Sequence, residues 1–184
     1  MDFKINAKMK LSDLDFRPHV TREIFIGVLN PDDGVVVPVE EWGKREDQAR
    51  AQFVVVIDKT QRLGLIINKT NDKCRESFGN AQFIAGLTMI DSPDVPPVCF
   101  GCPSRFDCML IYDAMCAGLD NILELIGGEK LSSSWIWTCE SDPEAEFTLI
   151  GAFVFDVEHG YIFTYDKNKV FDVRSVAPFN LKPL

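Results

Sequence analysis

Residues Cys102–Met115, CPSRFDCMLIYDAM, are the stretch that decides the fold, because they predict the clearest helix in the chain. Pro103 precedes the helix, and Ser104 followed by Asp107 three residues later is a capping-box pattern. The apolar positions recur at helical spacing and are Phe106, Leu110, Ile111 and Met115. A second helix is predicted at residues 119–126, where a pair of glycines ends the apolar pattern.

Strand-like patterns follow the second predicted helix. SSSWIWTCES (Ser132–Ser141) and GAFVFDVEHGYIFTYDKNK (Gly151–Lys169) contain alternating apolar residues, which are typical of strands. We predict strands at the WIW motif and at residues 147–157, 161–165 and 170–176. Because turn residues separate these runs, the C-terminal part is predicted to be a β-meander.

Two β-hairpins are predicted before the helices. NPDDG (Asn30–Gly34) is a turn signal between IFIGVL and VVVPV, and Pro38 in the second run indicates an edge strand. FVVVID (Phe53–Asp58) and RLGLIIN (Arg62–Asn68) flank KTQ in the same way. A short element is expected near residues 81–89. Antiparallel β-hairpins, two helices mid-chain and a β-meander together predict an α+β fold.

Length and charge indicate the domain organisation and limit the classes of possible partner. We predict an N-terminal arm at residues 1–22, which offers a route to a homo-oligomer, and one domain at residues 23–184. The net charge of −9 argues against nucleic acid as a partner, because a phosphate-backbone binder needs a basic face. No run approaches the roughly 20 apolar residues of a membrane span. The N-terminus lacks an apolar export-signal core, so we expect a cytoplasmic or virion-associated chain.

Three segments carry a resemblance to a known family. CPSRFDCMLIYD resembles LPS-x-x-E-(W/L)-x-x-(I/L)-Y, and IGGEKLSSSWIWTCES resembles IGG-x-x-L-x-x-x-x-YW-(S/T)-S-(T/S)-E. Residues 151–179 resemble a closing segment that ends in VRPVRAF. Over residues 99–179 the chain is therefore similar to a widespread bacterial and phage domain family with a C-type-lectin-like fold. That fold is shared with formylglycine-generating enzymes, and the family includes variable proteins diversified by retroelements.

The resemblance implies both a fold and a function. It implies a C-type-lectin-like fold in which Trp137 and Phe153 are core residues and Arg174 is a buried polar tie. The implied function is that of a non-enzymatic ligand-binding domain, such as a variable receptor-binding or surface-display protein of phage or bacterial origin. Its ligand is expected to be a protein or a carbohydrate, and no cofactor is expected.

The candidate ligand-binding residues lie on the C-terminal strands and loops. They are Cys139, Ser141, Phe147, Tyr161, Phe163, Tyr165 and Asp172. Tyr161, Phe163 and Tyr165 share one face of a predicted strand by its period of two. If that face is outward, it forms an aromatic patch suited to a ligand, and if it is inward, it is core. The pattern alone leaves both arrangements open.

Catalysis and metal binding have less support in the sequence. No catalytic residue or metal site is predicted, because Cys99 and Cys102 form one CxxC pair without a second pair at zinc-site spacing. Formylglycine-generating enzymes use reactive cysteines in the C-terminal part of their fold, where this chain has only Cys139. Two alternatives stay open: a structural subunit of a surface appendage or virion, and a thiol-dependent enzyme using Cys102 or Cys139.

Overall fold

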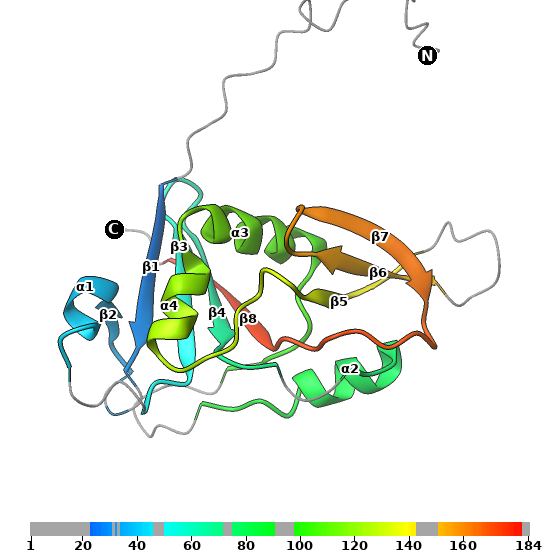
Figure 1. Cartoon of the computed structure of the whole chain (residues 1–184), viewed down its shortest axis with the longest axis horizontal. Coiled ribbons are helices and arrows are strands. Elements are labelled where there is room, and N and C mark those ends of the chain that lie inside the picture. Colours follow the sequence, from blue (N-terminus) through cyan, green and yellow to red (C-terminus); the bar gives the residue numbers. More distant parts are fainter. Residues whose placement is uncertain are drawn as a thin grey trace, which may run out of the picture.

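The computed structural model describes residues 23–30, 32, 34–45, 50–71, 75–90, 98–142 and 151–181. This part of the chain contains two antiparallel sheets and the helices α1 to α4, so the predicted α+β class is confirmed (Figure 1). The predicted arm at residues 1–22 lies outside the described residues. Among the described helices, none has the length and apolar character needed to cross a membrane.

The larger sheet has five strands in the order β2-β1-β3-β4-β8. These strands are β1 (Ile24–Leu29), β2 (Val36–Pro38), β3 (Phe53–Asp58), β4 (Leu63–Asn68) and β8 (Val176–Asn180). Both predicted hairpins are confirmed, because β1 pairs with β2 and β3 pairs with β4, each antiparallel. Pro38 lies on the edge strand β2, where its missing N–H costs no central ladder hydrogen bond.

The helices are α1 (Val39–Trp42), α2 (Phe78–Ala85), α3 (Arg105–Cys116) and α4 (Leu119–Leu125). The capping box before α3 is confirmed: the Asp107 N–H donates to Ser104 Oγ over 3.1 Å, and the Ser104 N–H donates to Asp107 Oδ2 over 2.8 Å. Of the apolar positions at helical spacing, Leu110 and Ile111 are buried, whereas Phe106 is exposed. Cys108 lies on the buried face of the helix as well.

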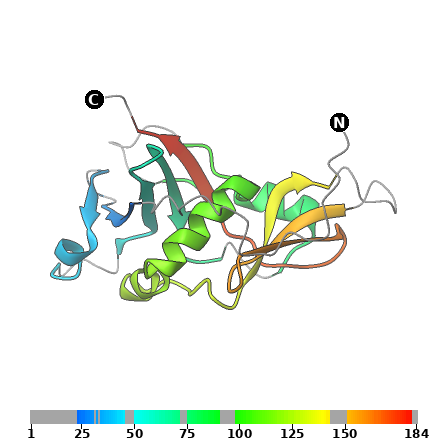
Figure 2. The same ribbon diagram turned by 90° about the horizontal axis from the view of Figure 1, so that it is seen from above.

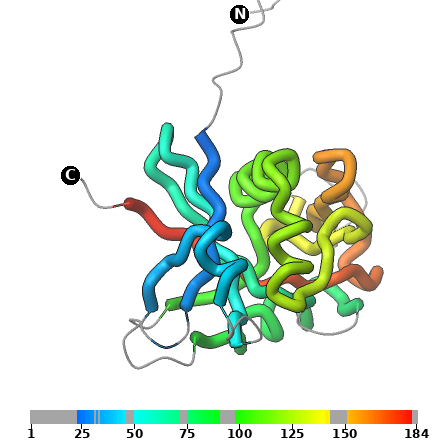
Figure 3. Tube along the Cα trace, turned by 60° about the vertical axis from the view of Figure 1, so that its left-hand side comes forward, coloured from blue at the N-terminus to red at the C-terminus, as the bar shows by residue number. Residues whose placement is uncertain are grey.

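Helices α3 and α4 cover one face of the five-stranded sheet (Figures 1 and 3). Strand residues at every second position face them, including Val54, Val56 and Leu65, and pack on Leu110 and Ile111 of α3. The opposite face of the sheet is covered in part by a separate cluster around Phe100. Figure 2 shows that α3 extends from the five-stranded sheet toward the smaller sheet and so connects the two.

The smaller sheet is the antiparallel meander of β5 (Trp135–Ser141), β6 (Gly151–Asp156) and β7 (Tyr161–Asp166). The predicted strand at residues 170–176 is wrong. Phe171 and Asp172 form only isolated bridges, and the chain then crosses to the other sheet, where β8 pairs with β4. The crossing is held by Arg174, a fully buried side chain that donates to the backbone oxygens of Asn68 and Glu129.

Candidate functional site

One face of the small sheet collects aromatic side chains from three strands. Trp135 of β5 lies opposite Asp156 of β6, and Asp156 lies opposite Tyr161 of β7. The next level of the same face joins Trp137, Val154 and Phe163, and a third level places Ala152 opposite Tyr165. Because side chains alternate between the two faces of a sheet, all three β7 aromatics share this face, as predicted.

Part of this face is covered by α2 and is closely packed. Trp137 is fully buried and meets the ring of Phe78 edge-on, with the two ring centroids 5.5 Å apart. Its indole Nε1–H donates to the backbone oxygen of Glu76 over 2.7 Å. Ala81 and Ala85 of α2 pack in the same cluster. The prediction that Trp137 is a core residue is therefore confirmed. Trp137 lies beneath the other aromatic side chains of this face.

The uncovered part of the face forms an aromatic strip. We define this strip by six rings: Trp135, His159, Tyr161, Phe163, Tyr165 and Phe171. Phe163 stacks on Trp135, with ring centroids 5.4 Å apart and planes 7° apart, and Tyr161 meets Phe163 edge-on at 6.2 Å. Tyr161 is 61% exposed and Phe163 is 40% exposed, so the outward alternative holds for these two residues. Two adjacent exposed rings on a rigid sheet form an apolar surface that a ligand can cover.

The inner end of the strip is half-buried. Tyr165 lies 5.0 Å from Phe171 and 5.8 Å from Trp135, measured between ring centroids. Phe171 in turn meets Trp137 edge-on at 5.0 Å. Tyr165 therefore joins the core cluster to the exposed rings. The order from buried Trp137 to exposed Tyr161 means that the outer rings are held in place by packing beneath them.

The turn between β6 and β7 fixes the outer end of the strip. His159 Nδ1 lies 3.0 Å from the buried carboxylate of Asp156, and the imidazole stacks on Tyr161 with planes 5° apart. Gly160 has φ +72° and lies against Tyr112, so an added side chain would be strained and would contact that ring. His159 is exposed, as expected of a turn residue, but the sequence did not indicate that it belongs to the aromatic strip.

The other predicted site residues are spread over the small sheet. Ser141 is exposed and lies opposite Ala152, on the face that carries Tyr165. Asp172 is in register with Ile136, so its side chain projects to the opposite face. Cys139 lies beside the start of α3, where its N–H donates to the Pro103 oxygen over 2.8 Å. Phe147 lies outside the described residues.

Phe153 does not occupy the core position that was predicted for it. Its side chain is half-buried on the face opposite the aromatic strip, and the guanidinium of Arg105 lies 4.4 Å above its ring. Arg105 also forms an ion pair with Glu140. The cation–π contact with Arg105 stabilises Phe153 at the surface, where the ring is not fully buried.

The environment of Cys139 disfavours a reactive thiolate. Burial raises the pKa of the Cys139 thiol, and the negative charges of Glu140 and Asp107 raise it further. Burial likewise raises the pKa of Cys108, the nearby thiol on α3. A nucleophilic cysteine needs the opposite shift, since only the thiolate attacks. Cys102 is buried and Cys99 exposed, so the two ends of the CxxC pair lie in different surroundings.

We expect Cys139 to be alkylated by iodoacetamide more slowly at pH 8 than an unperturbed thiol, because a raised pKa lowers the thiolate fraction. Replacing Glu140 with glutamine removes a charge that raises this pKa, so the rate should increase. The measurement is peptide-resolved mass spectrometry over a pH series. If the alkylation rate of Cys139 had the same pH midpoint in Glu140→Gln as in the unmodified chain, Glu140 would not influence the thiol.

Metal binding finds no support among the described residues, because no three His, Cys, Asp or Glu side chains gather there. Asp142 accepts a hydrogen bond from Thr164 Oγ1 over 2.6 Å and thereby links β5 to β7.

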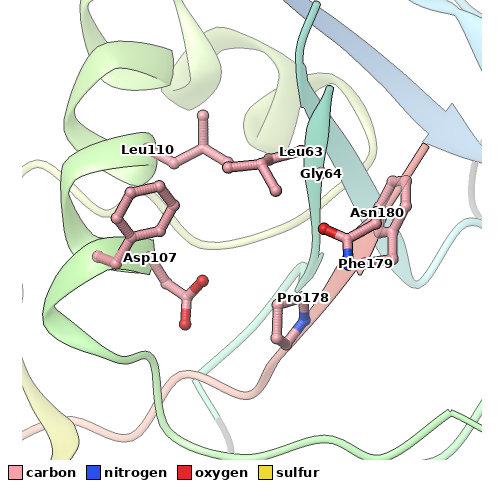
Figure 4. Close-up of a pocket in the computed structure, with 8 residues that line it drawn as sticks. Leu63, Gly64, Asp107, Leu110, Pro178, Phe179 and Asn180 are labelled. Carbon is pink, nitrogen blue, oxygen red and sulfur yellow. The ribbon is translucent and has the colours of Figure 1, made fainter. Parts of the chain in front are cut away.

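A second candidate surface, a concave one, lies between α3 and the five-stranded sheet. It is a groove of about 220 Å³, shown in Figure 4. The lining residues are Leu63, Gly64, Phe106, Asp107, Leu110, Pro178, Phe179 and Asn180. Leu110 points toward Leu63 across the groove, and its walls are mostly apolar. The sequence did not indicate this groove, because its two walls come from segments far apart in the chain.

Comparison with known proteins does not assign either surface. No family model matches the chain, and no curated protein sequence matches it. The aromatic strip and the groove are therefore interpreted from their own geometry.

Proposed function

We propose that the chain is a non-enzymatic ligand-binding domain with a C-type-lectin-like fold, whose ligand, a protein or a carbohydrate, binds the aromatic strip. The observation that carries this proposal is the pair of exposed rings, Tyr161 and Phe163, standing on the half-buried Trp135. Aromatic rings supply large contact areas and have few rotatable bonds, so little conformational entropy is lost when a ligand covers them.

Two positions that resemble the family framework support this proposal. Trp137 fills the core beneath the strip, and Arg174 holds the crossing to β8. Tyr161 and Phe163 lie between these positions and face outward. A rigid framework that presents exposed residues on strands and turns is the arrangement expected of a variable receptor-binding or surface-display protein.

The two alternatives have weaker support. The surroundings of Cys139 raise its pKa, which is unfavourable for a thiol-dependent enzyme. A structural subunit of a surface appendage or virion was predicted to assemble through residues 1–22, which lie outside the described residues. Neither alternative accounts for the exposed aromatic strip.

We expect the double variant Tyr161→Ser/Phe163→Ser to lose affinity for the ligand by about 30-fold or more, the usual effect of removing binding hot spots. The full-length chain and the variant would be screened side by side on a glycan array and on an array of extracellular proteins. Because both rings are partly exposed, the free energy of unfolding should fall by only about 1–2 kcal/mol, a cost that includes the stacking of Phe163 on Trp135.

Phe83→Ser is the matched control, because Phe83 is an exposed phenylalanine of α2 outside the aromatic strip. This control should keep every binding partner of the full-length chain. A partner bound equally by the double variant and by the full-length chain would place the binding surface elsewhere. Unfolding of the double variant would instead show that Tyr161 and Phe163 act as core.

A further inference from the structure

The groove between α3 and the five-stranded sheet lies beside the place where the N-terminal segment joins the sheet. Glu23, the first described residue, accepts a backbone hydrogen bond from the Lys59 N–H over 3.0 Å. Its own N–H donates to Thr60 Oγ1 over 3.2 Å. The flanking residues Asp58 and Gln61 line a narrow extension of the groove. Glu23, where the described part of the chain begins, therefore lies beside residues that line this extension of the groove.

The groove has the chemistry of a site for apolar side chains. Phe106 is 48% exposed and Met109, on the same helix, is 53% exposed, although both are large and apolar. Leu63 and Leu110 lie deeper and line both the groove and its extension. Covering such side chains with other apolar groups removes their surface from water, which stabilises the complex.

The carboxylates at the groove already accept hydrogen bonds from their own surroundings. Asp58 Oδ1 accepts from the N–H groups of Thr60 and Gln61 over 2.9 and 3.0 Å. Asp107 Oδ2 accepts from the N–H and hydroxyl of Ser104 over 2.8 and 2.7 Å. These carboxylates cap local turns, so the groove favours an apolar occupant over a polar small molecule.

We propose that residues 1–22 of the same chain bind in this groove, with Leu14 and Phe16 as the anchoring side chains. Leu14 and Phe16 are two positions apart and alternate with the charged residues Asp13, Asp15 and Arg17, so an extended segment places both on one side. Phe16 is seven residues before Glu23, and seven extended residues span about 23 Å. An extended segment of this length allows Phe16 to bind the groove of its own chain.

Charge favours the same occupant. Residues 1–22 contain five basic and three acidic side chains, a net charge of +2. Since the whole chain carries −9, residues 23–184 carry −11. A basic segment is attracted to an acidic body, and tethering raises its effective concentration at the groove. Pro178 on the edge strand β8 has no N–H to offer, so side chains and not an added strand make the contact.

Hydrogen exchange of the full-length chain, followed by mass spectrometry, tests this proposal. We expect the amides of residues 11–17 to exchange about tenfold faster in Phe106→Ser than in the unmodified chain, the effect of losing one partly covered apolar side chain. Phe83→Ser replaces another exposed phenylalanine, on α2, and should leave this exchange unchanged. Conversely, Leu14→Ser/Phe16→Ser should increase hydroxyl-radical labelling of Phe106, whereas Phe3→Ser/Ile5→Ser should not.

Two results would overturn the proposal. If residues 11–17 exchange equally fast in the unmodified chain and in Phe106→Ser, the segment does not occupy the groove. If the protection exists but falls on dilution, the groove is filled by the segment of a second copy. Protection that depends on Phe106 and stays constant on dilution supports binding within one chain. Because Phe106 lies outside the aromatic strip, none of these results depends on the proposed ligand-binding function.

Discussion

Replacing Arg174 with methionine is expected to lower the free energy of unfolding by about 3 kcal/mol, the contribution of two hydrogen bonds from a charged donor. The guanidinium is fully buried and donates from Nη1 to the Asn68 oxygen over 2.8 Å and from Nη2 to the Glu129 oxygen over 3.1 Å. Methionine fills similar space but leaves both carbonyls without these donors. The loss affects the end of β4, the loop after α4 and the crossing to β8 together.

Urea unfolding of matched variants measures this effect. Arg174→Lys keeps the charge but cannot make both bonds in the same geometry, so its loss should be intermediate. Arg75→Met is the surface control, because Arg75 is exposed and lies 3.8 Å from the Asp172 carboxylate. That control should cost about 0.5 kcal/mol or less. If Arg174→Met cost no more than the control, Arg174 would not hold the two sheets together.

The elements that were predicted correctly depend on local chemistry. The hairpin turn at NPDDG and the capping box of Ser104 and Asp107 need only residues that are close in sequence. The path after β7 was not predictable in this way. Phe171 has a strand-like pattern, yet the chain turns away because Arg174 has partners on β4 and after α4. The close packing of Phe179 against Gly64, which leaves no room for a side chain, is also visible only in three dimensions.

The candidate site was predictable in part for the same reason. The period of a strand placed Tyr161, Phe163 and Tyr165 on one face, but it did not show which neighbour covers that face. The answer depends on α2, whose Phe78 covers Trp137 and leaves Tyr161 exposed. The contribution of Phe171 was missed because its position depends on a bridge to Glu76, a residue far from it in the sequence.

Trp137→Ala is expected to cost about 3–5 kcal/mol of unfolding free energy, the range for removing a buried tryptophan or phenylalanine. The fully buried indole meets Phe78 and Phe171 edge-on, with ring centroids 5.5 and 5.0 Å away. Its Nε1–H also donates to the Glu76 oxygen, which would lose this donor. Much of the cost comes from the cavity, because α2 and the sheet cannot close it fully.

Trp135→Ala is the matched comparison, because Trp135 lies two residues earlier on the same face of β5 but is only half-buried. It should lose its stacking on Phe163, a term of about 0.5–1.5 kcal/mol beyond the area that it buries, and so destabilise less than Trp137→Ala. Urea unfolding gives the two costs, and near-ultraviolet circular dichroism reports the aromatic packing that remains. Equal costs would mean that Trp135 belongs to the core as much as Trp137 does, and the surface offered to a ligand would then begin at Phe163. A small cost for Trp135→Ala and a large cost for Trp137→Ala would show that Trp135 belongs to the surface that can contact a ligand. Trp137 would then belong to the core that supports this surface.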